Sequence, residues 1–206
     1  MKLIPFFMIL GALVLPLSST GTASTTELID AKKYDFSLVL DIKYATQDNF
    51  THQVVYPESR CLLRRAVAEA LARVQSSLRV QGFKLKVFDC YRPLSVQKKF
   101  WQLVPDERYV ADPKKGSRHN RGAAVDLTLL DLEGREVEMP TAYDNFTEKA
   151  HRNYKKLPKK AIQNRTLLEK AMEKEGFSGL DTEWWHFDFK GWEAYPIEDI
   201  QFSEVP

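Results

Sequence analysis

Residues 117–126 read SRHNRGAAVD, and the order of side chains in this stretch constrains the fold around it. His119 and Asp126 would lie roughly 23 Å apart on a straight strand, at about 3.3 Å per residue. They can meet only if the chain turns between them, and Gly122 is where it can turn. Taken singly, His119 is better explained as a surface loop histidine, and Asp126 as a buried carboxylate bonded to a helix cap or an arginine. A carboxylate within an apolar strand is, however, expensive to bury unless it is paired or binds a cation.

The residues that follow Gly122 predict a strand over residues 123–130. Val125, Leu127 and Leu129 would face the core, whereas Asp126 would lie on the opposite face. We therefore expect a functional site on the more polar face of a sheet.

Residues 183–186 read EWWH and supply a second carboxylate and a second imidazole. Glu183 and His186 are three residues apart, so they face opposite sides of a strand unless Glu183 lies in the turn before it. Trp185 is then expected in the core and Trp184 on the wall of the site. The alternative is an aromatic core strand that ends in a hydrogen-bonded histidine.

Hydrophobic periodicity predicts the remaining elements. The expected helices cover residues 60–81, 93–103 and 164–176. The other expected strands cover residues 36–44, 83–88 and 184–189. Helices and strands do not alternate in a repeating βαβ order, and no internal repeat or linker is present. We therefore expect residues 24–206 to form one α+β domain, with a central antiparallel sheet that carries a mononuclear zinc site and is flanked by helices.

Two imidazoles and two carboxylates are the groups that a catalytic zinc site requires. Such a site has three protein ligands and an open position, together with a base close to the reacting water. The chain has only four histidines, and two of them lie in these segments. The sequence therefore favours a zinc hydrolase with one zinc ion per chain, although manganese or cobalt could replace zinc.

Residues 89–93 read DCYRP and fall between a predicted strand and a predicted helix, where functional side chains are common. Arg92 could stabilise the negative charge of a tetrahedral intermediate. It could also form an ordinary salt bridge with Asp89 or Glu69, and the residues alone leave both interpretations open.

The composition is that of a globular protein of one domain. The 206 residues are 44% hydrophobic, and 30 basic and 28 acidic side chains give a net charge of +2. So small a balance gives no sign of the clustered basic face of a nucleic-acid-binding protein, and the basic run at residues 149–160 is better explained as a solvated loop or helix face. No nucleic-acid partner is expected.

Residues 1–23 predict an export signal. Lys2 supplies the positive charge, residues 3–17 are nearly all apolar, and Gly21 and Ala23 fit the small-residue rule for cleavage after Ala23. An uncleaved anchor is the alternative, but the apolar run is shorter than the about 20 residues that span a bilayer. We expect an exported protein, periplasmic or secreted, whose mature chain is not stably inserted in a membrane.

Cys61 and Cys90 are the only cysteines of the chain. An even number in an exported protein favours one disulfide, with Cys61 at the start of a helix and Cys90 at the end of a strand. Two buried thiols are the alternative, because the sequence does not fix the Cα separation that a bridge requires.

Together these segments resemble the zinc D-alanyl-D-alanine dipeptidases of the VanX type. Residues 117–126 follow the family pattern Ser-x-His-x-x-Gly-x-Ala-x-Asp, and residues 183–186 follow Glu-x-Trp-His, at every fixed position. Residues 89–93 resemble the arginine motif of the family, and residues 43–50 (KYATQDNF) resemble its N-terminal signature. The likeness runs from about residue 41 to residue 189, with four motifs in the right order.

The resemblance implies a role for each matched residue. The implied zinc ligands are His119, Asp126 and His186. Glu183 would be the general base toward the attacking water, and Arg92 would polarise the scissile carbonyl and stabilise the oxyanion.

The implied substrate-binding residues are Tyr44, Ser117 and Asp144, with Asp144 near the amino group of the dipeptide. Arg118 departs from the vancomycin-resistance members, which have a small polar residue at this position. Together with the predicted export, this difference favours cell-wall peptide turnover or recovery of D-alanine over antibiotic resistance.

The implied reaction is zinc-dependent hydrolysis of the dipeptide D-Ala-D-Ala. One alternative is a D,D- or L,D-carboxypeptidase that acts on longer peptidoglycan peptides, and the depth of the pocket would separate the two. A non-catalytic zinc-containing module that binds peptidoglycan is a further alternative, but such a module has no need of Glu183.

Overall fold

A five-stranded sheet is built around β5 (Ala124–Asp131), whose first seven residues are all buried. Its neighbours β4 (Phe83–Asp89) and β7 (Glu183–Phe189) both run antiparallel to it. At the edges, β2 (Val39–Leu40) pairs with β4 in parallel, and β6 (Phe177–Leu180) pairs with β7 antiparallel. The strand order is therefore β2-β4-β5-β7-β6. The predicted antiparallel sheet is confirmed, with the short edge strand β2 as its one parallel member.

The computed structural model describes residues 27–206 of the chain. The predicted signal peptide, residues 1–23, lies outside the described residues, so its cleavage stays a prediction.

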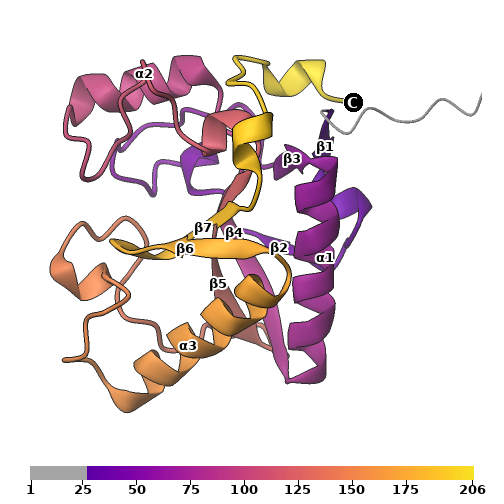
Figure 1. Ribbon diagram of the computed structural model, residues 1–206, viewed down its shortest axis with the longest axis vertical. Helices are drawn as coiled ribbons and strands as arrows, with labels where there is room; N and C mark the ends of the chain where they lie inside the picture. The colour runs from indigo at the N-terminus through magenta and orange to yellow at the C-terminus, as the bar shows by residue number, and fades with distance from the viewer. Residues whose placement is uncertain (1–26) are drawn as a thin grey trace, which may run out of the picture.

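Two long helices pack on the same side of the sheet. α1 (Arg65–Val80) contacts β4, α3 (Lys159–Lys174) contacts β5 and β6, and the two helices contact each other. The third helix, α2 (Leu94–Leu103), lies away from both of them (Figure 1). None of the helices within residues 27–206 has the length and apolar character needed to cross a membrane.

The two faces of β5 have different roles, as its alternating pattern predicts. Val125, Leu127 and Leu129 are fully buried in the hydrophobic core. Asp126 points to the other face, where it lines a cavity. In this α+β architecture the long helices cover one face of the sheet, and loops cover the polar face that carries Asp126.

Several predicted boundaries were wrong. The strand expected over residues 36–44 is reduced to the two residues of β2, because a 3-10 turn forms at Lys43–Ala45. The helix expected from residue 60 begins at Arg65, since β3 (Leu62–Arg64) precedes it and pairs with β1 (Leu28–Asp30).

Helix α3 begins five residues earlier than expected. It starts at Lys159 instead of residue 164, directly after Pro158, whose fixed φ suits the position before a helix. The hairpin strand β6 was not predicted, since its four residues include a glycine and show no alternation.

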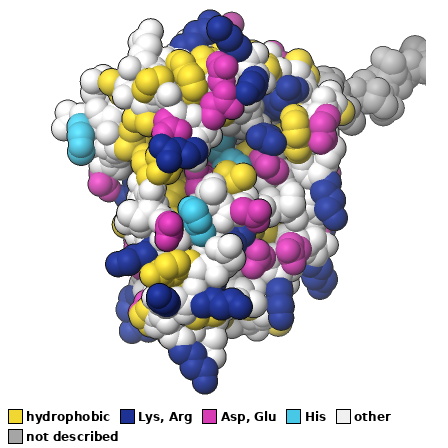
Figure 2. Space-filling view, turned by 60° about the vertical axis from the view of Figure 1, so that its left-hand side comes forward, with side chains coloured by type: hydrophobic (Ala, Val, Ile, Leu, Met, Phe, Trp, Pro, Cys, Tyr) yellow, Lys and Arg dark blue, Asp and Glu magenta, His cyan; other side chains and the backbone are white. Residues whose placement is uncertain are grey.

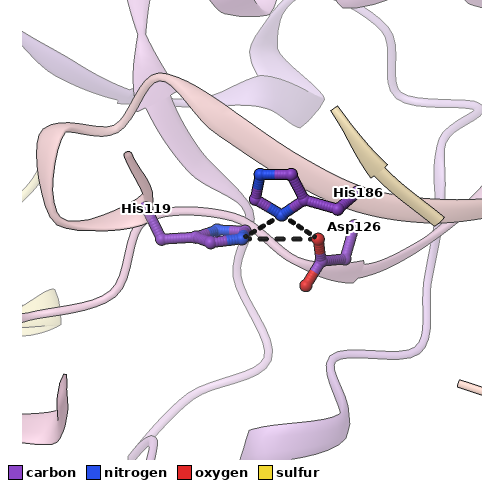
Figure 3. A group of neighbouring side chains, drawn as sticks. All are labelled: His119, Asp126 and His186. Carbon is purple, nitrogen blue, oxygen red and sulfur yellow. Dashed lines mark hydrogen bonds and ion pairs between the residues drawn. The ribbon is translucent and has the colours of Figure 1, made fainter. Parts of the chain in front are cut away.

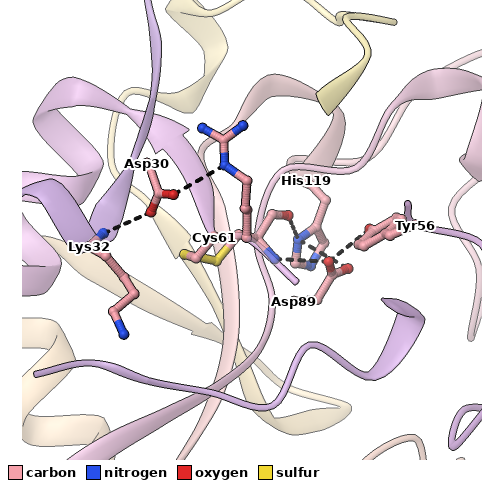
Figure 4. Close-up of a disulfide and its surroundings, with 8 residues drawn as sticks. Asp30, Lys32, Tyr56, Cys61, Asp89 and His119 are labelled. Atoms are coloured by element: carbon pink, nitrogen blue, oxygen red, sulfur yellow. Dashed lines mark hydrogen bonds and ion pairs between the residues drawn. A yellow bond between two sulfur atoms is a disulfide. The ribbon is translucent and has the colours of Figure 1, made fainter. Parts of the chain in front are cut away.

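Cys61 and Cys90 form the predicted disulfide, with their Cα atoms 5.2 Å apart (Figure 4). Cys61 directly precedes β3 instead of opening a helix, and Cys90 directly follows β4. The bridge therefore ties the small β1–β3 sheet to the end of β4, where the loop with Arg92 begins.

Candidate active site

The structure brings His119, Asp126 and His186 together (Figure 3). His119 Nε2 lies 3.2 Å from His186 Nδ1 and 3.3 Å from Asp126 Oδ1, and His186 Nδ1 lies 2.9 Å from Asp126 Oδ1. Each residue offers one atom that could bind a metal ion, these three atoms lie within 4.8 Å of one another, and all three residues are buried. The alternative of a surface loop histidine is therefore excluded for His119.

The turn between His119 and Asp126 forms where the sequence places it. His119 begins a 3-10 turn, and Gly122 closes it in the left-handed conformation with φ 66°. A side chain at Gly122 would place Cβ only 2.4 Å from Leu28 Cδ2, so both the conformation and the close approach require glycine. β5 then carries Asp126 opposite His186 on β7 in the sheet register.

Each histidine is oriented by a hydrogen bond from its outer nitrogen. His119 Nδ1 lies 2.6 Å from the carbonyl oxygen of Cys90, which can only accept, so Nδ1 carries the proton. His186 Nε2 donates in the same way to Asp188 Oδ1 at 2.9 Å. The inner nitrogens are thereby left to face Asp126, which matches the outer-shell support of metal-binding histidines.

These three groups fit a divalent metal ion. When only the outer nitrogens carry protons, two imidazole lone pairs and a carboxylate oxygen converge on one point, and none of these three atoms carries a hydrogen. A cation is the natural partner for such a cluster, and two imidazoles with one carboxylate are typical ligands of zinc in a hydrolytic site. The role of the three residues as ligands stays a prediction.

Glu183 lies beside this cluster, with its Oε2 3.9 Å from His186 Nδ1. The pKa of Glu183 is raised to about 7, mainly by burial; the His186 charge opposes this shift and the Asp126 charge adds to it. It does not lie in the turn before the strand, as expected, but is the first residue of β7. It can share a side with His186 because the pairing of β7 with β6 shifts register between Gly179 and Leu180, which breaks the alternation.

Arg92 forms the salt bridge that was one of its two interpretations, while its role toward an oxyanion stays a prediction. Its Nη2 and Nε atoms donate to Asp89 Oδ2 at 2.6 and 3.2 Å, so it does form a buried salt bridge. Its Nη1 donates to Gln97 at 2.8 Å. The guanidinium also lines the cavity that contains the histidine cluster. Burial alone would lower the pKa of Arg92, but the Asp89 carboxylate together with Tyr56, Tyr44 and Tyr143 raises it above its usual value, so the side chain remains charged.

The cavity has a volume of about 250 Å³. Its walls include the three predicted substrate-binding residues and three residues already described, namely Tyr44, Ser117, Asp144, Arg92, Glu183 and Trp185. In Figure 2, acidic, basic and hydrophobic side chains lie close together around a histidine that its neighbours largely cover. The cavity is therefore small, polar and bordered by both signs of charge.

Asp144 and Tyr44 are coupled within this cavity. The Tyr44 hydroxyl donates to Asp144 Oδ2 at 3.1 Å. Asp144 has a left-handed backbone with φ 54°, which few residues other than glycine, asparagine and aspartate adopt. Burial raises the pKa of Asp144 well above its usual range, and the Asp126 and Glu183 charges raise it further. An ammonium group would relieve this unfavourable environment.

One assignment on β7 was wrong. Trp184, expected on the wall of the site, is not among the residues that line the cavity; it is buried and donates from Nε1 to Thr141 at 2.9 Å. Trp185 lies in the core as expected, and its ring also lines the cavity. The register shift between Gly179 and Leu180 breaks the alternation from which the position of Trp184 was predicted.

Sequence reasoning missed two partners of the cluster. Tyr143 donates from its hydroxyl to Asp126 Oδ2 at 2.9 Å, and no sequence signal identified it. Asp188 lies two residues after His186 on the same strand, so the period of two places both side chains on one face and is the signal that suggests the contact. Arg118 also borders the cavity, with its Nε 3.6 Å from Asp188 and its guanidinium over the Trp192 ring.

The fold and the site are those expected of a metallopeptidase: three candidate metal ligands, a largely buried carboxylate and an arginine meet in one small cavity. A family model described as D-ala-D-ala dipeptidase, peptidase M15, matches residues 24–205, and the chain belongs to this family.

Relatives of known function agree with the family match. The chain is 39% identical over 181 residues to D-alanyl-D-alanine dipeptidase of Escherichia coli strain K12, covering 88% of this chain and 94% of the relative. It is 35% identical over 184 residues to the enzyme of the same name from Enterococcus faecalis, covering 79% and 91%. Among solved structures, the vancomycin resistance D,D-pentapeptidase VanY in complex with Zn(II) has a TM-score of 0.42 at 17% identity, over 65% of this chain and 76% of that one.

Proposed function

We propose that this protein hydrolyses the dipeptide D-alanyl-D-alanine to two molecules of D-alanine with the help of one bound zinc ion. The observation that carries the proposal is the small cavity in which a carboxylate with a pKa of about 7, an arginine and a second carboxylate surround the histidine cluster. Ligand sites for drug-sized molecules occupy roughly 300–1,000 Å³. A cavity of about 250 Å³ is therefore suited to a substrate as small as a dipeptide.

His119, Asp126 and His186 would hold the metal ion. When bound, the ion supplies Lewis acidity, which polarises a carbonyl oxygen and lowers the pKa of water toward neutrality. Zinc is the proposed metal because of the mixed imidazole and carboxylate ligands. Elemental analysis of the protein purified without added metal tests this point, and manganese or iron at one equivalent would contradict it.

Glu183 is the proposed general base. A base is most effective when its pKa lies near the working pH, and burial brings the pKa of Glu183 to about 7. The carboxylate takes a proton from the attacking water and then transfers it to the leaving amine. This sequence needs no covalent intermediate.

Arg92 is the proposed partner of the developing oxyanion. Its position is set on one side by Asp89 and on another by Gln97, so its remaining N–H groups have a fixed direction. A donor held in place before the reaction stabilises negative charge without reorganisation during it.

Asp144 is the proposed partner of the substrate ammonium group. The left-handed backbone at Asp144 and the hydrogen bond from Tyr44 hold its carboxylate at the cavity wall. Ser117, buried at the same wall, completes the proposed substrate-binding set.

Hydrolysis of two substrates by the zinc-loaded protein tests the proposal. We expect cleavage of D-Ala-D-Ala and no cleavage of a pentapeptide that ends in D-Ala-D-Ala. Cleavage of the pentapeptide would show an open groove and a carboxypeptidase. Failure to cleave either peptide with zinc bound would reject the proposed activity and leave a binding module as the better interpretation.

We also propose that the protein is exported and acts in cell-wall peptide turnover outside the cytoplasm. The apolar N-terminus and the Cys61–Cys90 disulfide support this location, since disulfides persist in oxidising compartments. Mass spectrometry of the protein recovered from cell fractions tests it. A mature chain beginning at Ser24 outside the cytoplasm is expected, and an intact chain in the cytoplasm would contradict the proposal.

A further inference from the structure

The hairpin of β6 and β7 contains a break in register that the site depends on. Gly179 pairs with Phe187, but the next pair joins Leu180 to Glu183. Residues 184–186 therefore lie on β7 without a partner on β6. This insertion is what allows Glu183 and His186, three residues apart, to reach the same cavity.

Such a break interrupts the regular ladder of hydrogen bonds between β6 and β7. Backbone carbonyls that the ladder no longer serves need other donors when they are buried. Arg152, which comes from the loop before α3, donates to one carbonyl on each strand at the break. Its Nε donates to the carbonyl oxygen of Leu180 at 2.9 Å, and its Nη2 donates to that of His186 at 2.7 Å.

Arg152 is itself held in a fixed position. Its backbone N–H donates to the carbonyl oxygen of Asp181 at 2.9 Å, and its Nη1 lies 3.4 Å from Glu169 on α3. The guanidinium lies over the Phe187 ring, 4.3 Å from its centroid. With a side chain only 8% exposed, Arg152 joins both arms of the hairpin to α3.

Gly179 makes room for this arrangement. A Cβ atom at this position would lie 2.2 Å from Arg152 Cζ and Nε, so no other residue fits while the guanidinium occupies its place. The glycine and the arginine therefore form one structural unit, although they are 27 residues apart in the sequence.

We propose that Arg152 is a positioning residue for the active site: by bridging the Leu180 and His186 carbonyls, it fixes the break that directs Glu183 and His186 into one cavity. It touches neither substrate nor metal in this role. The proposal rests on the proposed function: its kinetic prediction needs the proposed activity, and its affinity prediction needs only the proposed metal site, because metal affinity can be measured without any substrate.

The first test compares Arg152→Lys with Arg165→Lys. Lysine keeps the positive charge but lacks the planar fork that bonds two carbonyls at once. Arg165 is the matched control because it is also buried and donates to two carbonyls, those of His151 and Tyr154, both within the loop that carries Arg152. Zinc affinity by chelator competition, kcat and KM for D-Ala-D-Ala, and Tm are measured for both variants.

For Arg152→Lys we expect zinc affinity to fall about 10- to 100-fold, as for other groups that orient metal ligands. We expect kcat to fall by a similar factor while KM changes little, because the pocket walls remain. Arg165→Lys should lower Tm but leave zinc affinity and kcat within about twofold of the parent. Equal effects of the two variants on zinc affinity would overturn the proposal and assign Arg152 a purely structural role.

Chemical rescue gives an independent readout. Arg152→Ala leaves a space for a free guanidinium ion, and millimolar guanidinium should restore part of the lost zinc affinity and kcat. The same addition should not change Arg165→Ala. Where Arg152→Ala does not fold, Gly179→Ala takes its place, since the new methyl group must displace Arg152. Unchanged zinc affinity in a folded Gly179→Ala would contradict the proposal, even if the parent protein hydrolysed no D-Ala-D-Ala.

Discussion

Asp188 accepts a hydrogen bond from His186 Nε2 at 2.9 Å, two residues further along the same strand. This contact holds a proton on His186 Nε2 and turns Nδ1 toward Asp126. It also places a negative charge behind the imidazole, which makes the inner nitrogen a better electron donor. The hydrogen bond to His186 lowers the pKa of Asp188 despite the opposing effect of burial, so the carboxylate stays ionised at neutral pH.

Substitution of Asp188 is therefore expected to weaken metal binding without removing a ligand. The amide introduced by Asp188→Asn would still accept from Nε2 but carries no charge, so we expect zinc affinity to fall about 10-fold. Asp188→Ala removes the acceptor, so its zinc affinity should fall further, by about 100-fold. Chelator competition measures both, with Glu193→Gln as a control on an exposed acid beyond the strand. Zinc affinity equal to that of the parent in Asp188→Ala would show that Asp188 does not support His186.

Glu183→Gln separates the proposed base from the proposed ligands. Glutamine keeps the shape but cannot take a proton, so we expect kcat to fall roughly 100- to 10,000-fold. The variant should still hold one zinc ion per chain, whereas His119→Ala should lose it. Elemental analysis and turnover of D-Ala-D-Ala on the same samples distinguish the two. Near-normal turnover in Glu183→Gln would rule out its role as the base.

The approach of His119 to Asp126 could be predicted from sequence because it depends on local rules, whereas the place of His186 depends on the pairing of β5 with β7. A turn at Gly122 and the period of two along β5 are sufficient to bring His119 to the polar face that carries Asp126. The side on which Glu183 lies could not be derived in this way. It depends on a register break that Arg152 stabilises from a loop more than 30 residues away.

The fold shows the same division between local and distant causes. The helix at Arg65–Val80 and the strand at Phe83–Asp89 follow clear periods and were predicted to within a few residues. β1 and β3 were missed because each has only three residues, and each is a strand only through pairing with the other. The residues 62–64 continue the apolar pattern of the following helix, so nothing local separates them from it.

Asp144→Asn is expected to stabilise the metal-free protein at neutral pH. In the folded state burial raises the pKa of Asp144 well above that of the unfolded chain, which is about 3.9. The folded protein therefore holds this proton more tightly, and stability from the protonated group is fully present below about pH 4. This contribution to stability is lost as pH rises through the pKa of Asp144 in the folded protein. Asparagine does not titrate and tolerates the left-handed backbone, so it avoids this loss.

Urea unfolding in the presence of a chelator, at pH 4 and at pH 7.5, measures the effect of Asp144→Asn. The stability of the variant relative to the parent should increase between the two pH values, and KM for D-Ala-D-Ala should rise because the ammonium loses its partner. A stability difference that does not change with pH would contradict the altered pKa of Asp144.

Gly122→Ala is expected to be more destabilising than a glycine substitution in an open turn. Gly134 is the matched control, because its φ of 87° is also left-handed but a Cβ there would meet nothing within 4 Å. The free energy of unfolding of Gly134→Ala should therefore fall only by the cost of a left-handed backbone at alanine, about 1–2 kcal/mol. Gly122→Ala must in addition displace Leu28 Cδ2, which a new Cβ would approach to 2.4 Å, and overpacking of this kind costs about 1–3 kcal/mol. Urea unfolding with chelator present should thus show that Gly122→Ala lowers the free energy of unfolding by on the order of 3 kcal/mol. Equal losses in the two variants would mean that β1 yields freely at Leu28, and that the turn between His119 and Asp126 depends on backbone conformation alone.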